Sequence, residues 1–232
     1  MDKYDFAFRG CTASSYGICI EKRPDMPVGR EDPKFVTIAG RDSPLTIRTG
    51  ERENIEISLS CGFVEDRDLW NEKVRKIRSW LSGEGELIFT DSADFYWKVR
   101  DIEIKKIVRT TKRMGKFDLI FICDPYEYLE SGKMELGAKE AAYNPYQTSH
   151  PVYTISGNGT CALTVNGKTM KATVGQNLTI DTDRMMAYRV DGSMNNTAVN
   201  GDYEDLYLKP GENTITITSG FGLKVIPNWR CL

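Results

Sequence analysis

The sequence predicts a mainly β protein with two domains: an α+β barrel or sandwich with one helix, followed by an antiparallel β-sandwich. Three observations predict this fold class. One segment alternates strictly between apolar and polar residues, one segment alone has helical spacing, and the second half contains short apolar runs separated by turn dipeptides. With 232 residues the chain can form one large β domain or two small ones, and we expect two.

The first half contains the clearest strand and the only segment with a helical pattern. From Ile55 to Phe63 the residues alternate, so one face of a strand is apolar and the other solvated. After an acidic stretch from Glu65 to Asp68, apolar residues recur at intervals of four, three and four, as Trp70, Val74, Ile77 and Leu81. This spacing predicts one buried stripe of a helix, which Gly83 then ends.

Further strands are expected after the helix. Glu86 to Thr90 and Phe95 to Val108 flank a turn at residues 91–94, and the apolar positions change phase between Val99 and Ile102, which indicates a bulge or bend. The apolar face of the next strand consists of Phe117, Leu119, Phe121 and Cys123. Asp124-Pro125 is expected to stop this strand.

A connector is predicted between the two domains. Residues 131–151 lose periodicity and collect glycine, asparagine and proline, so the boundary is placed near residue 145, giving domains 1–145 and 146–232. Beyond it, turn dipeptides separate the apolar runs, and Asn166-Gly167 is a strong hairpin signal. The others are Asn158-Gly159, Asp191-Gly192 and Pro210-Gly211.

Composition favours a soluble protein made without an export signal. The formal charge of −2 gives no field that would attract nucleic acid or membranes in general. No apolar run is long enough to cross a bilayer, and the start at Met1-Asp2-Lys3 lacks the basic and apolar regions of a signal peptide. The six cysteines lack C-x-x-C spacing, so we expect buried thiols that act as small hydrophobes.

No residue pattern predicts catalysis, a metal or a cofactor. The single histidine, His150, lies in the Pro-flanked connector and is expected to be a solvent-exposed linker residue. Asp181-Thr182-Asp183 lacks the glycine and distal glutamate of a calcium loop and is interpreted as a turn or strand end. Acidic residues are too abundant for any pair to indicate glycoside hydrolysis. We therefore predict no catalytic residue, no cofactor, no metal site and no enzymatic activity.

The segment from Lys98 to Lys116 is strongly basic. It holds eight lysines and arginines against two acidic residues, mostly on a hairpin with its tip near Arg113. A solvated hairpin and a subunit interface both fit this pattern, and contact with DNA is a weaker alternative. Under the interface hypothesis, the positive charges pair with acidic surfaces on a neighbouring copy. The candidate interface residues are Lys105, Lys106, Arg109, Lys112 and Arg113.

Aromatic residues of the second half leave two interpretations open. Sugar stacking is one, and a place in the core or an interface is the favoured other. The residues are Tyr188, Tyr203, Tyr207 and Trp229.

Several motifs in a fixed order resemble the distal tail (Dit) proteins of long-tailed bacteriophages. At the start these are Phe8-Arg9-Gly10 and then Ser14 to Ile18, and the first domain leaves through Cys123-Asp124-Pro125-Tyr126. In the second half, Leu178 to Thr182 and Leu206 to Ile215 are similar to that family. The resemblance covers almost the entire chain.

This resemblance implies a split β-barrel with one helix, related to tail-tube subunits, joined to a galectin-like β-sandwich. It implies a structural protein that forms a ring, usually a hexamer, with copies of itself at the tail tip of a phage or prophage of a Gram-positive host. The implied partners are the tail tube protein, the tail-associated hub protein and receptor-binding or fibre proteins. Neither a membrane nor a sequence-specific nucleic acid is an expected partner.

Two other functions stay open on the sequence. A carbohydrate-binding module that attaches to bacterial cell-wall glycans is the main alternative, and an unrecognised hydrolase is less supported because no nucleophile, base and oxyanion arrangement is found.

Overall fold

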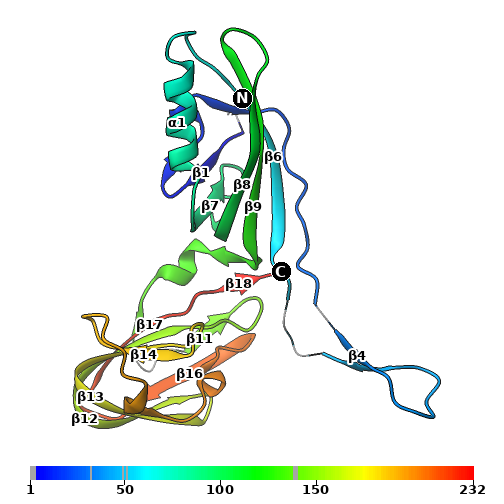
Figure 1. Ribbon diagram of the computed structural model, residues 1–232. Coiled ribbons are helices and arrows are strands. Elements are labelled where there is room, and N and C mark those ends of the chain that lie inside the picture. The colour runs from blue at the N-terminus through cyan, green and yellow to red at the C-terminus, as the bar shows by residue number, and fades with distance from the viewer. Residues whose placement is uncertain (1–3, 32, 49, 51, 138–140) are drawn as a thin grey trace. The chain divides into compact units, whose positions relative to one another are not determined.

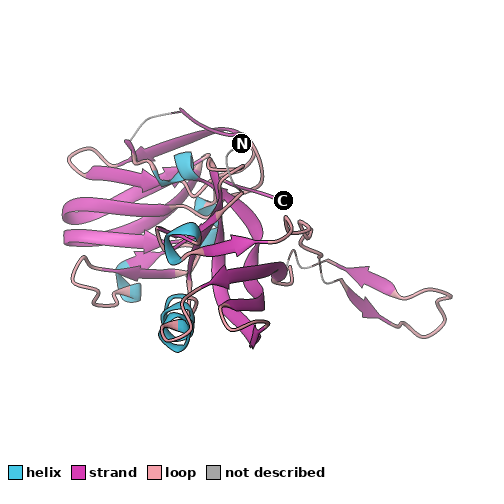
Figure 2. Ribbon diagram, turned by 90° about the horizontal axis from the view of Figure 1, so that it is seen from above, coloured by secondary structure: helices cyan, strands magenta, loops and turns pink. Residues whose placement is uncertain are grey.

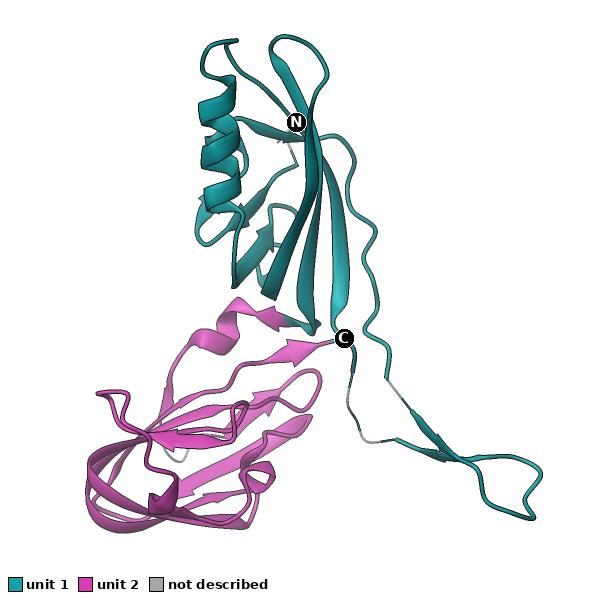
Figure 3. Ribbon diagram, in the orientation of Figure 1, with its two compact units in different colours: residues 1–127, 232 teal, residues 128–231 magenta. Residues whose placement is uncertain are grey.

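The computed structural model describes residues 4–31, 33–48, 50, 52–137 and 141–232. It divides the chain into two compact units, residues 1–127 with 232 as unit 1 and residues 128–231 as unit 2 (Figure 3). Residues 1–3 of the N-terminal segment and 138–140 of the predicted connector lie outside the described residues.

Unit 1 is a curled antiparallel sheet with one α-helix, α1 (Trp70–Trp80), beside it (Figure 1). The strand order is β2-β1-β7-β8-β9-β6-β3, and β4 and β5 form a separate two-stranded sheet. The bounds are β1 (Phe6–Phe8), β2 (Cys11–Thr12), β3 (Ile18–Ile20), β4 (Lys34–Val36), β5 (Leu45–Ile47), β6 (Ile55–Val64), β7 (Gly85–Phe89), β8 (Phe95–Arg109) and β9 (Met114–Leu129), with a 3-10 turn at Ser14–Tyr16.

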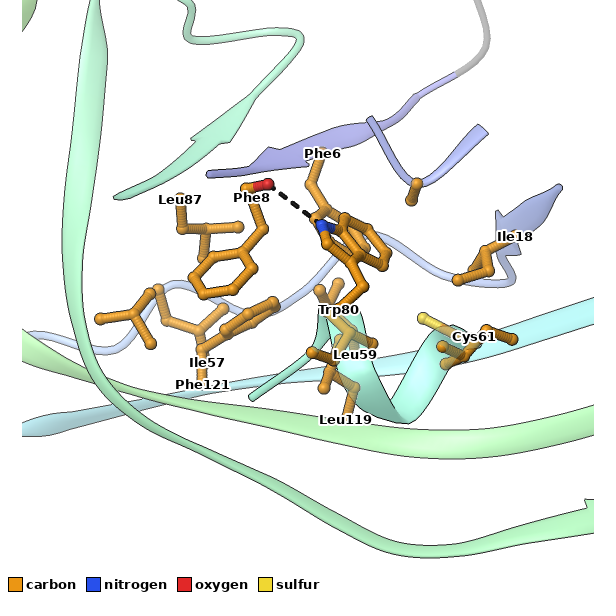
Figure 4. Close-up of a cluster of buried hydrophobic side chains, with 14 of the residues drawn as sticks. Phe6, Phe8, Ile18, Ile57, Leu59, Cys61, Trp80, Leu87, Leu119 and Phe121 are labelled. Carbon is orange, nitrogen blue, oxygen red and sulfur yellow. Dashed lines mark hydrogen bonds between the residues drawn. The ribbon is translucent and has the colours of Figure 1, made fainter. Parts of the chain in front are cut away.

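The predicted strand and helix of unit 1 are confirmed, and together they build its core. Every second residue of β6 is buried, as alternation requires, while α1 buries Trp70, Ile77 and Trp80. Figure 4 shows Trp80 among the rings of Phe6 and Phe8, and its indole N–H donates to the Phe8 carbonyl oxygen at 3.2 Å. The acidic stretch Glu65 to Asp68 precedes the helix, and Glu72 is the acidic residue of its first turn.

The expected strands after the helix are also present, with one correction. In β8 both Val99 and Ile102 pack on the core, so the phase change is real. The expectation that Asp124-Pro125 stops the next strand is wrong, because β9 continues to Leu129. The β6 ladder ends where Ile55 pairs with Cys123, so a proline two residues later costs that ladder no hydrogen bond.

Unit 2 is built from antiparallel strands, which dominate the molecule in Figure 2. One path runs β10-β17-β12-β13-β14, while β16 joins β11 to β12 and β15 pairs with β13. The bounds are β10 (Leu136–Gly137), β11 (Ala141–Asn144), β12 (Val152–Val165), β13 (Lys168–Asp181), β14 (Met186–Tyr188), β15 (Val199–Asn200), β16 (Gly211–Ile217), β17 (Gly222–Ile226) and β18 (Arg230–Cys231), with 3-10 turns at Glu130–Lys133, Asn196–Ala198 and Tyr203–Leu206. The predicted mainly β fold class is confirmed.

Of two Asn-Gly pairs in unit 2, one forms the predicted turn and the other lies within a strand. Asn166 and Gly167 have φ values of 49° and 81° and close the β12–β13 hairpin between Val165 and Lys168, as predicted. Asn158-Gly159, in contrast, is no turn and lies inside β12, where Asn158 pairs with Gly175. Fourteen residue pairs between β12 and β13 hold this segment extended, so cross-strand pairing outweighs the local turn preference.

The boundary between the compact units falls at residues 127/128, not near residue 145. The segment predicted as a connector contributes strands to unit 2, because β10 pairs with β17 and β11 pairs with β16. These strands are only two and four residues long, which is too short to give a periodic pattern in the sequence.

Candidate interaction surfaces

The five predicted interface residues lie together at one end of unit 1. Lys105, Lys106 and Arg109 occupy the last five positions of β8, while Lys112 and Arg113 lie in the turn before β9. All five side chains belong to exposed residues. The structure therefore brings these charges together, and their contact with a neighbouring copy stays a prediction.

Two of these cations, Arg109 and Arg113, bind groups of the same chain. The Arg109 guanidinium lies 4.8 Å from the centre of the Trp70 ring and donates to the carbonyl oxygens of Arg67, at 3.3 Å, and Lys112, at 2.5 Å. Arg113 forms an ion pair with Asp66 at 2.8 Å. Both arginines thus join the β8–β9 turn to the segment before α1 and order this end of the unit.

Lys105 and Lys106 instead line a groove of about 390 Å³ between α1 and β8. Trp70, Val74 and Arg78 line it from the helix, and residues 104–107 line it from the strand. Arg78 is not among the residues that the sequence predicts for an interface, although its i, i+4, i+8 spacing with Trp70 and Val74 places all three on one helical stripe. That spacing is the signal by which the sequence could have revealed it.

The opposite flank of α1 is electrostatically balanced. A smaller pocket there is lined by residues that the first groove does not share, among them Glu72 and Lys76. Lys73 pairs with Glu65 at 3.4 Å, and Lys76 pairs with Glu72 at 2.7 Å. The hydrogen bond from Lys76 lowers the pKa of Glu72 below its ordinary value.

A second surface is the β4–β5 hairpin with its flanking segments, the described residues of 21–54, which we call the arm (the hairpin is blue, at lower right in Figure 1). Among the described residues, β4 and β5 pair only with each other. Every residue of both strands is exposed. Seven large apolar side chains of the arm are exposed: Met26, Val28, Phe35, Val36, Ile38, Leu45 and Ile47.

In unit 2, His150 is not the solvent-exposed linker residue expected from the sequence. Its side chain is 23% exposed and stacks on Tyr207, with ring centres 4.1 Å apart. Nε2 lies 2.9 Å from an Arg230 nitrogen, and Nδ1 lies 3.1 Å from an Asp183 oxygen. Because a guanidinium only donates, Nε2 accepts from Arg230, which leaves Nδ1 to donate to Asp183. His150 therefore fastens segments of unit 2 that lie far apart in the sequence.

The remaining residues that the sequence singled out are held inside unit 2. None of the four aromatic residues considered for sugar stacking is exposed, and Trp229 is buried in the core of unit 2. Asp181 ends β13 and accepts from the backbone N–H groups of Asp183 and Arg184, which makes this segment the predicted strand end. Within the described ranges, no group of three or more His, Cys, Asp or Glu residues is placed to hold a metal ion.

Burial divides the six cysteines. Cys61, Cys123 and Cys161 are buried, in agreement with the sequence expectation, whereas Cys11 and Cys19 are exposed and Cys231 is intermediate. Burial is the main cause that raises the pKa of Cys61 and of Cys123 to about 12. In the part of the chain that is described, no helix has the length and apolar character needed to span a membrane.

Comparison with known proteins identifies the family. A family model described as phage tail protein N-terminal domain matches residues 1–125, which is more than half of the chain. The search of curated proteins finds no match. Among solved structures, the chain is similar to the crystal structure of SPP1 Dit, whose title calls it a paradigm of the hub adsorption apparatus in Gram-positive infecting phages.

This structural match has a TM-score of 0.69 at 14% sequence identity and covers 96% of this chain and 97% of the SPP1 protein. At that identity the match establishes a shared fold over both units, and the family model independently identifies the N-terminal unit. The chain therefore belongs to the phage tail proteins defined by this N-terminal domain, and it has a Dit-like fold.

Proposed function

We propose that this protein is a non-enzymatic subunit of a ring, a hexamer, at the distal end of a phage tail. The ring connects the tail tube protein to the tail-associated hub protein and to the receptor-binding or fibre proteins. Membership of the phage tail family and the Dit-like fold support the location. The exposed arm of unit 1 is the observation that supports ring formation.

The arm has the properties of an element that is completed by another chain. A lone two-stranded hairpin is marginally stable in water, and monomeric proteins rarely expose large contiguous apolar surfaces. Here Phe35 is 65% exposed and Val28 is 81% exposed. A second copy of the chain is the occupant that fits, because closed rotational symmetry requires each subunit to offer one surface to a different surface of the next.

The four aromatic residues considered for sugar stacking give the carbohydrate-binding alternative no support, although Tyr143 and Tyr146 of unit 2 are exposed. Sugar stacking needs exposed aromatic faces, and the rings considered for it are buried or half-buried.

The test compares the oligomeric state of the wild-type protein with that of an arm variant. Phe35→Ser with Ile47→Ser removes apolar surface from β4 and β5 without touching the core of unit 1. We expect a wild-type mass of six chains by light scattering after size exclusion, with open rings in negative-stain images, and mainly single chains for the variant, because the apolar contact is lost.

A matched control removes similar apolar surface elsewhere. Val190 is 74% exposed and Met194 is 66% exposed in unit 2, so Val190→Ser with Met194→Ser should leave the rings intact. A wild-type protein that stays monomeric, or rings that survive the arm substitutions, would contradict the proposal.

A further inference from the structure

The groove between α1 and β8 combines an apolar floor with uncompensated positive charge. Val74, Ile104 and Ile107 are half-buried against the core of unit 1, and Trp70 is only 8% exposed. Three exposed cations, Arg78, Lys105 and Lys106, surround this floor. None of the described acidic residues lines the groove. The groove is therefore suited to an anionic group attached to an apolar one.

The cations of this groove differ from their neighbours. Lys73 and Lys76, on the other flank of α1, are both ion-paired. Among the described residues, none forms an ion pair with Arg78, Lys105 or Lys106, although Lys106 also lines a second pocket that contains Glu21 and Asp118. Like charges gathered without counter-charges repel one another, so a carboxylate brought into the groove meets a favourable field.

One residue that lines the groove carries a buried polar atom without a partner in the described part of the chain. Trp70 lines it, and the indole N–H of Trp70 is buried with no acceptor among the described residues. Buried donors are nearly always hydrogen-bonded, so Trp70 is an exception in the wall of this groove.

We propose that this groove is a docking site for an acidic segment of a different protein, in which carboxylates flank a large apolar side chain. The apolar side chain packs on Ile104 and Ile107, and the carboxylates meet the three cations. The arm of a second copy is a poorer match, because residues 21–54 carry seven basic and seven acidic residues and so offer no net negative charge. The site does not depend on ring formation.

The experiment uses the full chain and a labelled synthetic peptide of about ten residues, in which glutamates flank a central leucine. Its control peptide replaces each glutamate by glutamine. Fluorescence anisotropy should show binding of the glutamate peptide, with weakening at higher salt, and no binding of the glutamine peptide. Failure of the glutamate peptide to bind the wild-type protein would overturn the proposal.

Two variants with equal changes in charge locate the site. Lys105→Glu with Lys106→Glu reverses two cations inside the groove and should weaken binding by about tenfold or more, since the contact becomes repulsive. Arg75→Glu with Lys112→Glu reverses two exposed cations that do not line the groove and should leave binding unchanged. Equal losses in both variants would mean general charge attraction and would overturn the assignment.

Light scattering on the same variants separates this proposal from the ring. The groove variant should keep the oligomeric state of the wild type. If the Lys105→Glu with Lys106→Glu variant dissociates into single chains, the groove is an interface between copies of this chain and the assignment to a different protein is wrong. A monomeric wild-type protein that binds the glutamate peptide would contradict the ring while supporting the groove.

Discussion

At the scale of single residues, burial sets the chemistry of the cysteines of unit 1. The thiols of Cys61 and Cys123 face the core, and removal from water makes their ionisation unfavourable. Nearby carboxylates add to this effect, from Asp118 for Cys61 and from Asp124 for Cys123. Both pKa values rise from 9.0 to about 12, so these thiols remain protonated and act as small apolar groups.

This burial predicts a loss of stability in alkali. Between pH 9 and pH 12 the unfolded chain releases the two thiol protons and the folded chain keeps them. The free energy of unfolding therefore falls as the pH rises through this window, and it is unaffected by these groups at lower pH. Urea unfolding at a series of pH values from about 8 to about 10.5 measures the slope.

A cysteine variant checks the cause of that slope. Cys61→Ala with Cys123→Ala is less stable at neutral pH because buried volume is lost, but its unfolding free energy should fall less steeply with pH. Some slope remains, because burial also raises the pKa of Tyr4 to about 12. Identical slopes for variant and wild type would show that the two thiols are not responsible.

At the scale of elements, the β6–β9 pair depends on one glycine. Gly115 is paired with Phe63, and a Cβ added to Gly115 would collide with Cζ of the Phe63 ring. The aromatic ring thus covers the bare glycine backbone across the strands. One ladder position away, a Cβ on Gly62 would lie 3.4 Å from its nearest neighbour, an oxygen of the Glu21 side chain.

These two glycines form a matched pair for mutation. Gly115→Ala should destabilise the protein by about 1 to 3 kcal/mol, because the methyl group forces the Phe63 ring out of the core. Gly62→Ala should change stability by less than about 1 kcal/mol, since its neighbour is a flexible side chain. Urea unfolding compares them, and equal effects of the two substitutions would contradict the steric explanation.

At the scale of the whole molecule, two separate cores imply two units that fold by themselves. The buried clusters of unit 1 and unit 2 share no residue. The boundary at residue 128 leaves every strand from β10 to β18 in one fragment, whereas a cut at residue 146 removes β10 and β11. Without β11, the buried Asn144 amide no longer donates to the carbonyl oxygens of Gln147 and Leu208.

Two fragments test the position of this boundary. Fragment 128–231 should unfold cooperatively in urea and show the circular dichroism of a β protein. Fragment 146–232 should be unfolded or aggregate, because β16 loses β11, one of its two partner strands, and exposes an unpaired edge. If the shorter fragment is equally stable, residues 128–145 are a connector after all.

The amino-acid sequence by itself determined the features that depend on neighbours along the chain. The alternation of β6, the stripe of α1 and the Asn166-Gly167 turn follow from side-chain periodicity and from backbone preference, which act over a few residues. The order of motifs along the chain likewise indicated a Dit-like protein, which the family model and the shared fold support.

Only the tertiary structure decided the features that depend on distant partners. β9 continues past Pro125 because its ladder with β6 has already ended at Cys123. β12 continues through Asn158-Gly159 because β13 pairs with it there. The groove forms where residues of α1 and β8 that lie at least 26 positions apart come together. No local pattern therefore separates Lys105 and Lys106 from Arg109 and Arg113, which bind groups within the chain. Pairing and burial are set by which distant segments meet, and spacing along the chain does not encode that choice.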